Sequence, residues 1–209
     1  MRRTRVKFCG ITRPTDAHAA VALGADALGF NFWPGSPRFI APAAAGEIAR
    51  QLPPFVTLVG LFVNQSPDDI NAAMAASGLG LVQLHGDEPA ELCRSLARPY
   101  IKAVRMREDT SLESICASYA DAAAILADTY VAGVAGGTGQ TFDWGRLPAS
   151  AAKPLILAGG LTADNVASAI TKVRPFAVDV SGGIEQAKGI KDAGLMSRFM
   201  HEVRKVDYE

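Results

Sequence analysis

Cys9 is the residue of this chain whose type and position are best suited to chemistry. It ends a short, strand-like run from Arg5 to Cys9 and is followed directly by Gly10. A thiol at the tip of a buried strand, just before a turn, is a candidate catalytic group. The competing interpretation is packing, because unpaired cysteine is among the most buried residue types.

The other two cysteines, Cys93 and Cys116, fit the packing interpretation. Each lies on an apolar stripe with the i, i+3, i+4, i+7 spacing of a helix. The three cysteines show neither a Cys-x-x-Cys motif nor Cys/His ligand spacing, so the sequence predicts no disulfide framework and no zinc site. Cys9 lies on no such stripe and remains the candidate catalytic thiol.

Asp128 is a second candidate, because it ends an otherwise apolar run that begins at Ala123. An arbitrary aspartate at a strand end more often caps a turn. Here the following loop is long and rich in glycine, from Gly133 through Gly136-Gly137-Thr138-Gly139 to Phe142, as a cover over a ligand would be. We therefore expect Asp128 to face a ligand.

Two glycine pairs come directly after apolar runs near the end of the chain. They are Gly159-Gly160 and Gly182-Gly183, the second preceded by Ser181. Glycine lets backbone N–H groups approach an anion with no Cβ in the way, so the pairs predict a phosphate site. The alternative is two ordinary tight turns, which glycine also serves.

Three further polar residues follow expected strands. Arg38 lies in a loop stiffened by prolines, where a guanidinium can fork onto a carboxylate, although alone it would be interpreted as solvated. Gln83 and His85 are two residues apart, so their side chains point to the same side of a strand. We count both as candidate substrate-binding residues. The alternative for His85 is a buried histidine that makes its hydrogen bonds within the protein and does not contact substrate.

These residues must be positioned by a pattern that recurs along the chain: a short apolar run, a loop marked by glycine or proline, and a stretch with helical periodicity. The expected strands are Val6 to Cys9, Ala27 to Phe32, Val56 to Val63, Leu81 to Leu84, Tyr100 to Val104, Ala123 to Asp128, Pro154 to Ala158 and Phe176 to Val180. The expected helices lie near 14–23, 42–51, 67–76, 88–97, 110–119, 143–149, 162–170 and 190–205.

Eight such units predict an α/β fold, a single-domain (β/α)8 TIM barrel spanning residues 1–209, with an open doubly wound sheet as the alternative. No linker, low-complexity segment or composition shift divides the chain. In such barrels the chemistry lies where strands end and loops begin, and strands 7 and 8 usually supply the phosphate site. The candidate residues all lie at such ends.

The charge balance favours a small-molecule partner. Lys and Arg total 21, as do Asp and Glu, and no basic stretch indicates nucleic acid or a membrane surface. The first four residues are too few and too polar for a signal peptide, and no apolar run approaches the ~20 residues of a spanning helix. We expect a cytoplasmic protein, and either a monomer or a homodimer is compatible with the sequence.

Six motifs together resemble one family. KFCGIT, NFWPGSPR, VQLHGDE, ADTYVAGVAGGTGQTFDW, LAGGL and DVSGGIE, each at a strand end, are similar in order and across nearly the whole chain to phosphoribosylanthranilate isomerase, a (β/α)8 enzyme of tryptophan biosynthesis. The resemblance implies an intramolecular oxidoreductase, an aldose–ketose isomerase. Its reaction is the Amadori rearrangement of N-(5-phosphoribosyl)anthranilate to 1-(o-carboxyphenylamino)-1-deoxyribulose 5-phosphate. The substrate nitrogen serves as electron sink, so neither metal nor organic cofactor is expected.

Matched position by position, Cys9 corresponds to the family's general base and Asp128 to its general acid. These roles require a thiol pKa lowered from about 8.5 and an aspartate pKa raised from about 3.9. Lys7, on the same side of the strand as Cys9, is a candidate for lowering the thiol pKa.

By the same matching, Arg38 faces the anthranilate carboxylate, the two glycine loops hold phosphate, and Asp179 lies near the sugar. The family commonly reads DVSSGVE, whereas here Gly182 replaces the second serine. If the serine hydroxyl contacts the phosphate, its loss would weaken substrate binding by about 1 kcal/mol. If backbone N–H groups hold the phosphate, the change would cost little. Gly35 stands where the family often has a basic residue, which leaves Arg38 as the main cation of its loop.

Two alternatives remain at this point. A histidine-pathway isomerase on the same scaffold resembles this chain in chemistry, but it uses an aspartate where Cys9 stands and has a two-phosphate substrate site. A phosphate-ligand sensor without catalysis would need neither a thiol at a strand end nor Asp128.

Overall fold

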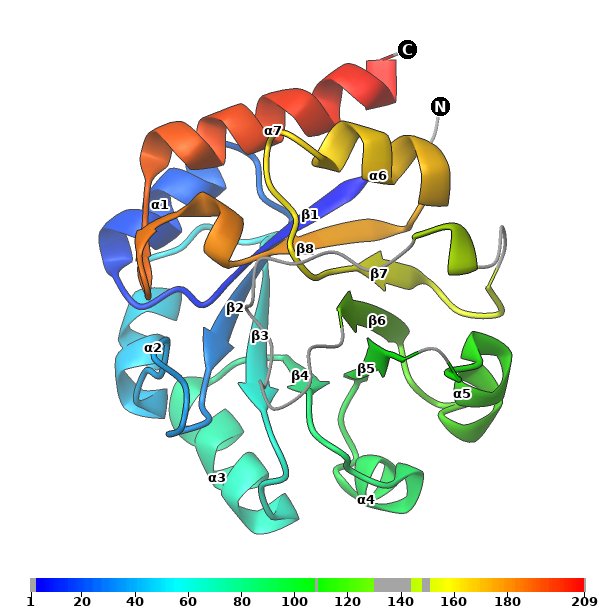
Figure 1. Ribbon diagram of the computed structural model, residues 1–209. Helices are drawn as coiled ribbons and strands as arrows, with labels where there is room; N and C mark the ends of the chain where they lie inside the picture. The colour runs from blue at the N-terminus through cyan, green and yellow to red at the C-terminus, as the bar shows by residue number, and fades with distance from the viewer. Residues whose placement is uncertain (1–2, 108, 130–143, 148–150, 209) are drawn as a thin grey trace.

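The computed structural model describes residues 3–107, 109–129, 144–147 and 151–208. Parallel strands form a closed barrel in which each strand pairs with the next and β8 pairs with β1 (Figure 1). The strands of the barrel are β1 (Arg5–Cys9), β2 (Ala27–Asn31), β3 (Thr57–Phe62), β4 (Leu81–Leu84), β5 (Tyr100–Met106), β6 (Ala124–Thr129), β7 (Leu155–Leu157) and β8 (Ala177–Val180). The (β/α)8 barrel expected from the sequence is therefore confirmed.

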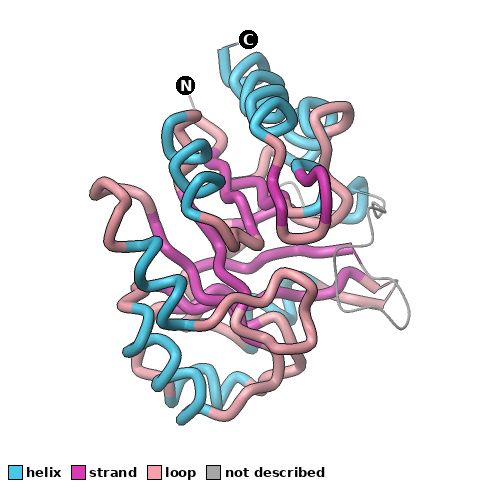
Figure 2. The backbone as a smooth tube through the Cα atoms, turned by 90° about the vertical axis from the view of Figure 1, so that its left-hand side faces the viewer, coloured by secondary structure: helices cyan, strands magenta, loops and turns pink. Residues whose placement is uncertain are grey.

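Helices surround the barrel, with the strands in the middle of the molecule (Figure 2). They are α1 (Pro14–Ala22), α2 (Pro42–Ala49), α3 (Pro67–Ser77), α4 (Ala90–Ser95), α5 (Leu112–Ser118), α6 (Val166–Val173) and α7 (Ala193–Tyr208), with short 3-10 turns η1 (Trp144–Arg146) and η2 (Gly182–Ile184). Cys93 and Cys116 lie buried on α4 and α5, as their spacing predicts.

The strands are apolar because both of their faces are covered. Along β5 and β6, residues such as Ile101 and Leu126 fill the barrel interior, whereas Ile125 belongs to the layer between strands and helices. All of β7 is buried. Continuous rather than alternating hydrophobicity is typical of parallel strands with helices outside and a packed interior.

Local sequence signals account for the start and end of α3. The hydroxyl of Ser66 accepts a hydrogen bond from the backbone N–H of Asp69 at 3.1 Å, and Pro67 occupies the first turn. Proline fits there because the first-turn N–H groups have no partner within the helix. Gly78 ends the helix with a φ of +69°, a left-handed conformation that favours glycine.

Three expected helices differ from the structure, and the one expected at 162–170 is Val166–Val173. Around 143–149 the described residues form only the turn η1, and the rest of that range lies outside the described residues. The helix expected at 190–205 is Ala193–Tyr208, because Ile190–Lys191 (β10) pairs instead with Glu185–Ala187 (β9). Gly189, with a φ of +80°, turns this hairpin, and the Asp192 carboxylate then accepts the N–H of Leu195. The hairpin was not expected from the sequence, because the helical spacing of apolar residues begins before Ala193.

Helix α7 closes the fold at the junction of β8 and β1. Phe199 of α7 packs edge-on against Phe8, with ring centroids 6.1 Å apart. The Asp207 carboxylate accepts the backbone N–H of Thr4 at 2.9 and 3.0 Å. These contacts bring the two ends of the chain together (Figures 1 and 2).

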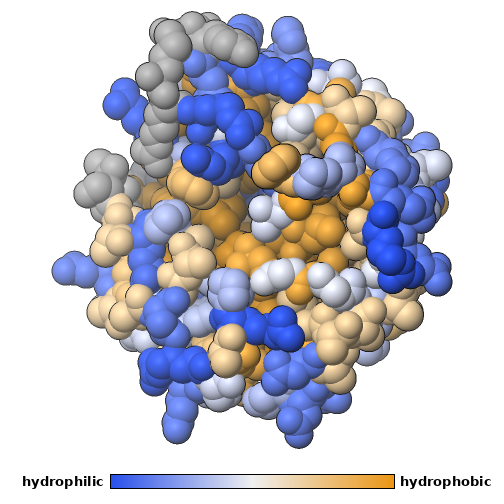
Figure 3. All heavy atoms as spheres, turned by 180° about the vertical axis from the view of Figure 1, so that it is seen from behind, coloured by the Kyte–Doolittle hydropathy of each residue, from blue (hydrophilic) through white to orange (hydrophobic). Residues whose placement is uncertain are grey.

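Seen from behind, hydrophobic atoms gather in the middle of the face and hydrophilic side chains surround them (Figure 3). Among the described residues, no helix has the length and apolar character needed to cross a membrane.

Candidate active site

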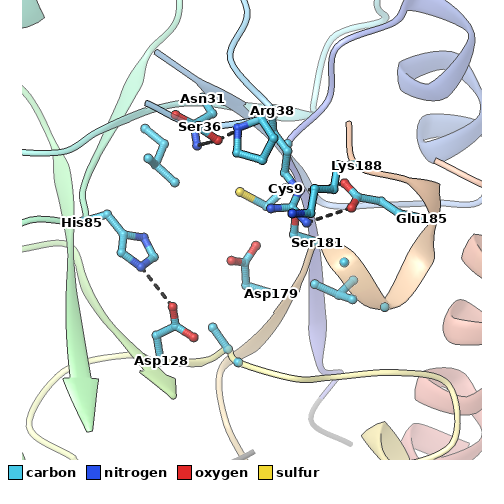
Figure 4. Close-up of a pocket in the computed structure, with 18 of the residues that line it drawn as sticks. Cys9, Asn31, Ser36, Arg38, His85, Asp128, Asp179, Ser181, Glu185 and Lys188 are labelled. Carbon is cyan, nitrogen blue, oxygen red and sulfur yellow. Dashed lines mark hydrogen bonds and ion pairs between the residues drawn. The ribbon is translucent and has the colours of Figure 1, made fainter. Parts of the chain in front are cut away.

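The carboxyl ends of the strands surround a cavity of about 890 Å³. Several residues singled out in the sequence line it together: Cys9, Arg38, His85, Asp128, Asp179, Gly159, Gly160, Ser181, Gly182 and Gly183. In the view of Figure 4, Cys9 and Asp128 face the cavity from different sides and the Asp179 carboxylate lies between them. Gln83 is the exception, because it does not line the cavity and is fully buried. The glycine-rich loop expected to cover Asp128, at 130–143, lies outside the described residues.

Cys9 and Lys7 lie on the same side of β1, as the period of a strand predicts. Cys9 is in register with Gly29 of β2, and a Cβ at Gly29 would lie 2.9 Å from the Cys9 sulfur and 3.1 Å from the Lys7 nitrogen. A side chain at position 29 would therefore displace both groups. Glycine on the neighbouring strand makes room for a thiol and an ammonium to lie together.

Lys7 is also in register with Asp179 of β8, and its ammonium donates to that carboxylate at 2.8 Å in a buried ion pair. Burial alone would lower the pKa of Lys7, but Asp179 and Cys9 raise it further than burial lowers it. Lys7 therefore carries a positive charge at the bottom of the site.

Burial raises the pKa of the Cys9 thiol. Lys7 and Lys191 act in the opposite direction, whereas the negative charge of Asp179 adds to the rise. The expected lowering of this pKa is therefore wrong. Lys7 has the predicted effect, but desolvation outweighs it because the thiol is buried in the barrel wall.

Asp128 is joined to the two polar residues at the end of β4. The Nε2 atom of His85 lies 3.0 Å from an Asp128 carboxylate oxygen, and its Nδ1 lies 2.9 Å from the amide nitrogen of Gln83. The amide nitrogen can only donate, so this network assigns the imidazole proton to Nε2, which donates to Asp128. His85 is thus both a hydrogen-bonded histidine and a residue of the cavity wall.

A buried ion pair holds the loop that carries His85. The Glu88 carboxylate accepts a hydrogen bond from the ammonium of Lys102 at 2.7 Å. It also accepts hydrogen bonds from the backbone N–H groups of Gly86 and Asn64. Burial would raise the pKa of Glu88, but Lys102 and the backbone donors lower it below its usual value. The carboxylate therefore stays charged and fastens the end of β4 to β5 and to the loop after β3.

Arg38 is more constrained than its sequence context indicated. Its Nε and Nη2 atoms each donate at 2.8 Å to the Glu185 carboxylate, and Lys191 donates to that carboxylate at 2.8 Å (Figure 4 shows Arg38 and Glu185). Arg38 and Lys191 outweigh the effect of burial and lower the pKa of Glu185. The interpretation of Arg38 as a solvated arginine is therefore wrong.

The loop of Arg38 is braced by its own polar residues. Asn31 donates to the Ser36 hydroxyl at 3.0 Å, and the same hydroxyl accepts the backbone N–H of Arg38 at 3.1 Å. The Trp33 ring covers Gly35, where a Cβ would lie 2.5 Å from a ring carbon. This contact accounts for glycine in place of the basic residue that is common in the resembling family.

The two glycine loops pack against each other. Gly159 and Gly160 have φ values of +87° and +62°, and the Asn165 side chain donates to the Gly160 carbonyl at 2.9 Å. A Cβ at Gly183 would lie 2.0 Å from the Leu161 carbonyl oxygen, so only glycine fits there. At Gly182 the nearest atom to a Cβ is Arg38 Nη2 at 3.4 Å, which leaves room for a side chain.

Glu185, Lys188 and Lys191 are site residues that sequence reasoning missed. Glu185 and Lys188 line the cavity, and Lys191 lies directly behind Glu185. Lys191 fell within the expected helix, so its return toward strand 8 could not be read from periodicity. Gly189, directly after the charged Lys188, was the available signal for a turn at this place.

Comparison with known proteins identifies a consistent set of relatives. Residues 6–202 match the family model for N-(5'phosphoribosyl)anthranilate (PRA) isomerase. The N-(5'-phosphoribosyl)anthranilate isomerase of Pseudomonas putida (strain GB-1) is 55% identical over 204 residues, covering 98% of this chain and 99% of the relative.

Two solved structures have the same fold over their whole length. One is a phosphoribosyl anthranilate isomerase in complex with reduced 1-(o-carboxyphenylamino)-1-deoxyribulose 5-phosphate, with a TM-score of 0.82, 41% identity, and coverage of 97% of this chain and 99% of that one. The other is a monomeric form of the dimeric isomerase from Thermotoga maritima, with a TM-score of 0.83, 40% identity and the same coverage.

Proposed function

Since the chain belongs to the N-(5'-phosphoribosyl)anthranilate isomerase family, we propose that Cys9 and Asp128 perform the proton transfers of its reaction. That reaction converts N-(5-phosphoribosyl)anthranilate into 1-(o-carboxyphenylamino)-1-deoxyribulose 5-phosphate in tryptophan biosynthesis. We class it as an intramolecular oxidoreductase, because C1 is reduced while C2 of the same molecule is oxidised.

Asp128 acts as the general acid in the first step. Its proton moves to the furanose ring oxygen, the bond between C1 and that oxygen breaks, and the nitrogen lone pair forms a C1=N bond. The product is an open-chain Schiff base. The Nε2–H of His85 stabilises the carboxylate that remains on Asp128, since it donates to that carboxylate at 3.0 Å.

Cys9 acts as the general base in the second step. Its thiolate removes the C2 proton, the C–H electron pair forms a C1=C2 bond, and the C1=N electrons return to nitrogen. The resulting enolamine gains a proton at C1 and loses one from the C2 hydroxyl, which gives the ketone. A buried thiolate is a strong base, because the burial that raises the thiol pKa favours proton uptake.

Substrate binding uses the remaining groups of the cavity wall. We assign the phosphate to the loops at Gly159-Gly160 and Ser181 to Gly183, the anthranilate carboxylate to Arg38, and the sugar hydroxyls to Asp179. Gln83 and His85 support the site through Asp128. The product analogue bound by the relative of known structure carries the same phosphate and carboxylate groups, which supports this assignment.

The observation that carries the proposal is that a thiol and a carboxylate, Cys9 and Asp128, which are far apart in the sequence, line one cavity in a chain of this family. This combination also separates it from the histidine-pathway alternative, where an aspartate replaces the thiol. Retention of both groups argues against a sensor without catalysis.

Replacement of Asp128 tests the assignment of the acid. Asp128→Asn keeps the size of the side chain but cannot donate a carboxylic proton, so we expect kcat to fall by about 100-fold or more while the Kd of the reduced product analogue changes little. Loss of substrate fluorescence on adding enzyme to fresh phosphoribosylanthranilate measures the rate. An unchanged kcat would remove Asp128 from this role.

We further propose that the enzyme is a cytoplasmic homodimer. Phe55 is fully exposed, with a φ of +71°, after two prolines in the loop between α2 and β3. This loop lies at the amino end of the barrel, away from the active-site loops. A stiffened loop that presents an aromatic ring fits an interface between copies, and the Thermotoga maritima relative is described as dimeric. Amino-acid biosynthesis from phosphoribosyl intermediates is the reason for placing it in the cytoplasm.

A further inference from the structure

The guanidinium assigned to the substrate carboxylate already has a carboxylate partner in this protein. Glu185 occupies Nε and Nη2 of Arg38, whereas no hydrogen bond to a described residue uses Nη1. An arginine neutralised by an internal glutamate attracts a second carboxylate only weakly. The charge of Arg38 therefore has to be considered together with that of its neighbours.

Lys191 changes this balance. Its ammonium is completely buried and donates to Glu185 at 2.8 Å, while Glu185 is 5% exposed and Arg38 13%. The three side chains thus form a chain of two cations with one carboxylate between them. Such a group has a net charge of +1, and Arg38 is its member closest to solvent.

Other charges around this group are paired with one another. Lys7 is bound to Asp179, and Arg13 to Asp16. The described ion pairs therefore leave the positive charge of the three-residue chain uncompensated, and Lys188 at the rim of the cavity adds a further cation.

We propose that Lys191 is a positioning residue that keeps Arg38 available to the substrate carboxylate by neutralising Glu185. This rests on the proposed function, in which Arg38 binds the anthranilate carboxylate. Glu185 holds the guanidinium by Nε and Nη2 and leaves Nη1 to the ligand. Lys191 supplies the charge that Glu185 would otherwise remove.

The same ammonium reaches the phosphate loop. Lys191 Nζ lies 3.2 Å from the carbonyl oxygen of Ser181 and 3.4 Å from its hydroxyl. The backbone N–H of Lys191 donates to Asp16 at 3.0 Å, so the hairpin that carries Lys191 is anchored to the first turn of α1. Lys191 thereby connects the carboxylate and phosphate subsites, and a test must separate these two effects.

Two inhibitors make this separation. One is the reduced product analogue, and the other is the same molecule without the aromatic carboxylate. For Lys191→Met, we expect the Ki of the carboxylated analogue to rise about 10-fold or more, and that of the decarboxylated analogue to change less than about 3-fold. Lys172→Met, at an exposed position on α6, controls for loss of one positive charge and should change neither Ki.

A double variant that restores the net charge of the group is the decisive test. Glu185→Gln combined with Lys191→Met leaves Arg38 with its full charge, so we expect the double variant to recover the wild-type preference for the carboxylated analogue to within about 3-fold. A double variant no better than Lys191→Met would overturn the proposal, as would a single variant that keeps the preference. An equal rise in both Ki values would show that Lys191 acts only on the phosphate loop.

A single replacement covers the case in which Lys191→Met does not fold. Glu185→Gln alone leaves two uncompensated cations, so the preference for the carboxylated analogue should increase, and an unchanged preference would contradict the proposal. Wild-type enzyme that binds both analogues equally would instead refute the assignment of Arg38 in the proposed function, whatever the behaviour of Lys191.

Discussion

Cys9 shows how burial and nearby charges compete at a single residue. Its thiol lies beside the Lys7 ammonium, which stabilises the thiolate, but the Lys7–Asp179 ion pair brings a negative charge to the same place. Desolvation is the largest effect, and the thiol pKa is raised. The thiolate is thus a minor species at neutral pH, and kcat/KM should rise with pH as the base becomes deprotonated.

Alkylation of Cys9 tests whether the pKa of its thiol is raised. A raised pKa means that Cys9 should react with iodoacetamide more slowly at pH 8 than a free thiol does, with a midpoint at higher pH. Lys7→Met removes the largest effect that lowers the pKa, so the midpoint should move further upward. Mass-spectrometric peptide mapping separates Cys9 from Cys93 and Cys116. A midpoint below that of a free thiol would contradict the role of desolvation.

Gln83 acts on the site from beneath it. Its amide nitrogen sets the tautomer of His85, while its oxygen Oε1 is buried without a hydrogen-bond partner among the described residues. A buried unpaired acceptor costs roughly 1–3 kcal/mol. An amide retained at such a cost indicates that its donor function is needed.

Gln83→Leu should therefore separate catalysis from stability. We expect kcat to fall by about 10-fold because His85 is no longer oriented toward Asp128, while the free energy of unfolding changes by less than about 1 kcal/mol. Urea denaturation and the fluorescence assay give the two quantities. The matched variant Gln83→Glu keeps the shape of the side chain but loses the amide donor, and it should also lower kcat. Full activity in both variants would exclude a role for the amide.

Among the elements, the loops after β7 and β8 pack directly against each other. Gly183 lies so close to the Leu161 carbonyl that the second loop can approach the first only without a side chain there. Gly182, one residue earlier, has space around it. The two glycines look alike in the sequence, but only one is required by packing.

Replacing each of these glycines with alanine gives two matched variants that test the packing argument. Gly183→Ala should push the two loops apart and raise the KM for substrate by about 10-fold or more, whereas Gly182→Ala should change KM less than about 3-fold. Gly182→Ser, which restores the common family residue, should leave binding unchanged or improve it by up to about 1 kcal/mol. Equal effects of the two alanines would contradict the packing argument.

The whole molecule has an active-site end and an opposite end, at which we propose the interface between copies. At the amino end of the barrel, Phe55 is presented in a left-handed backbone conformation that L-residues rarely adopt. Such a ring in water is unfavourable, and burial against a second copy would offset that cost.

The proposed dimer can be tested at Phe55. Wild-type protein should elute as a dimer in size-exclusion chromatography with light scattering, and Phe55→Asp should elute as a monomer. Because the active site lies at the other end of the barrel, the variant should keep its kcat within about 2-fold. Phe39→Asp, the matched control at the other exposed phenylalanine of the described residues, should remain dimeric. A monomeric wild-type protein would refute the proposed interface.

The sequence by itself determined the barrel and the candidate residues of its site. Apolar runs, helical periodicity and glycine or proline signals are local, so they predicted the strands and most helices within a few residues. The rule that barrel sites lie at strand ends then selected Cys9, Asp128 and the glycine loops. The hairpin at 185–191 was missed because its pairing competes with a helical pattern.

Only the tertiary structure decided how these residues interact. Lys7 meets Asp179 across 172 positions of sequence because closure of the barrel places β8 beside β1. Arg38 meets Glu185, 147 positions away, through the hairpin after β8. The direction of the Cys9 pKa shift was also beyond the sequence. Desolvation depends on every atom around the thiol, whereas the sequence shows only its neighbours along one strand.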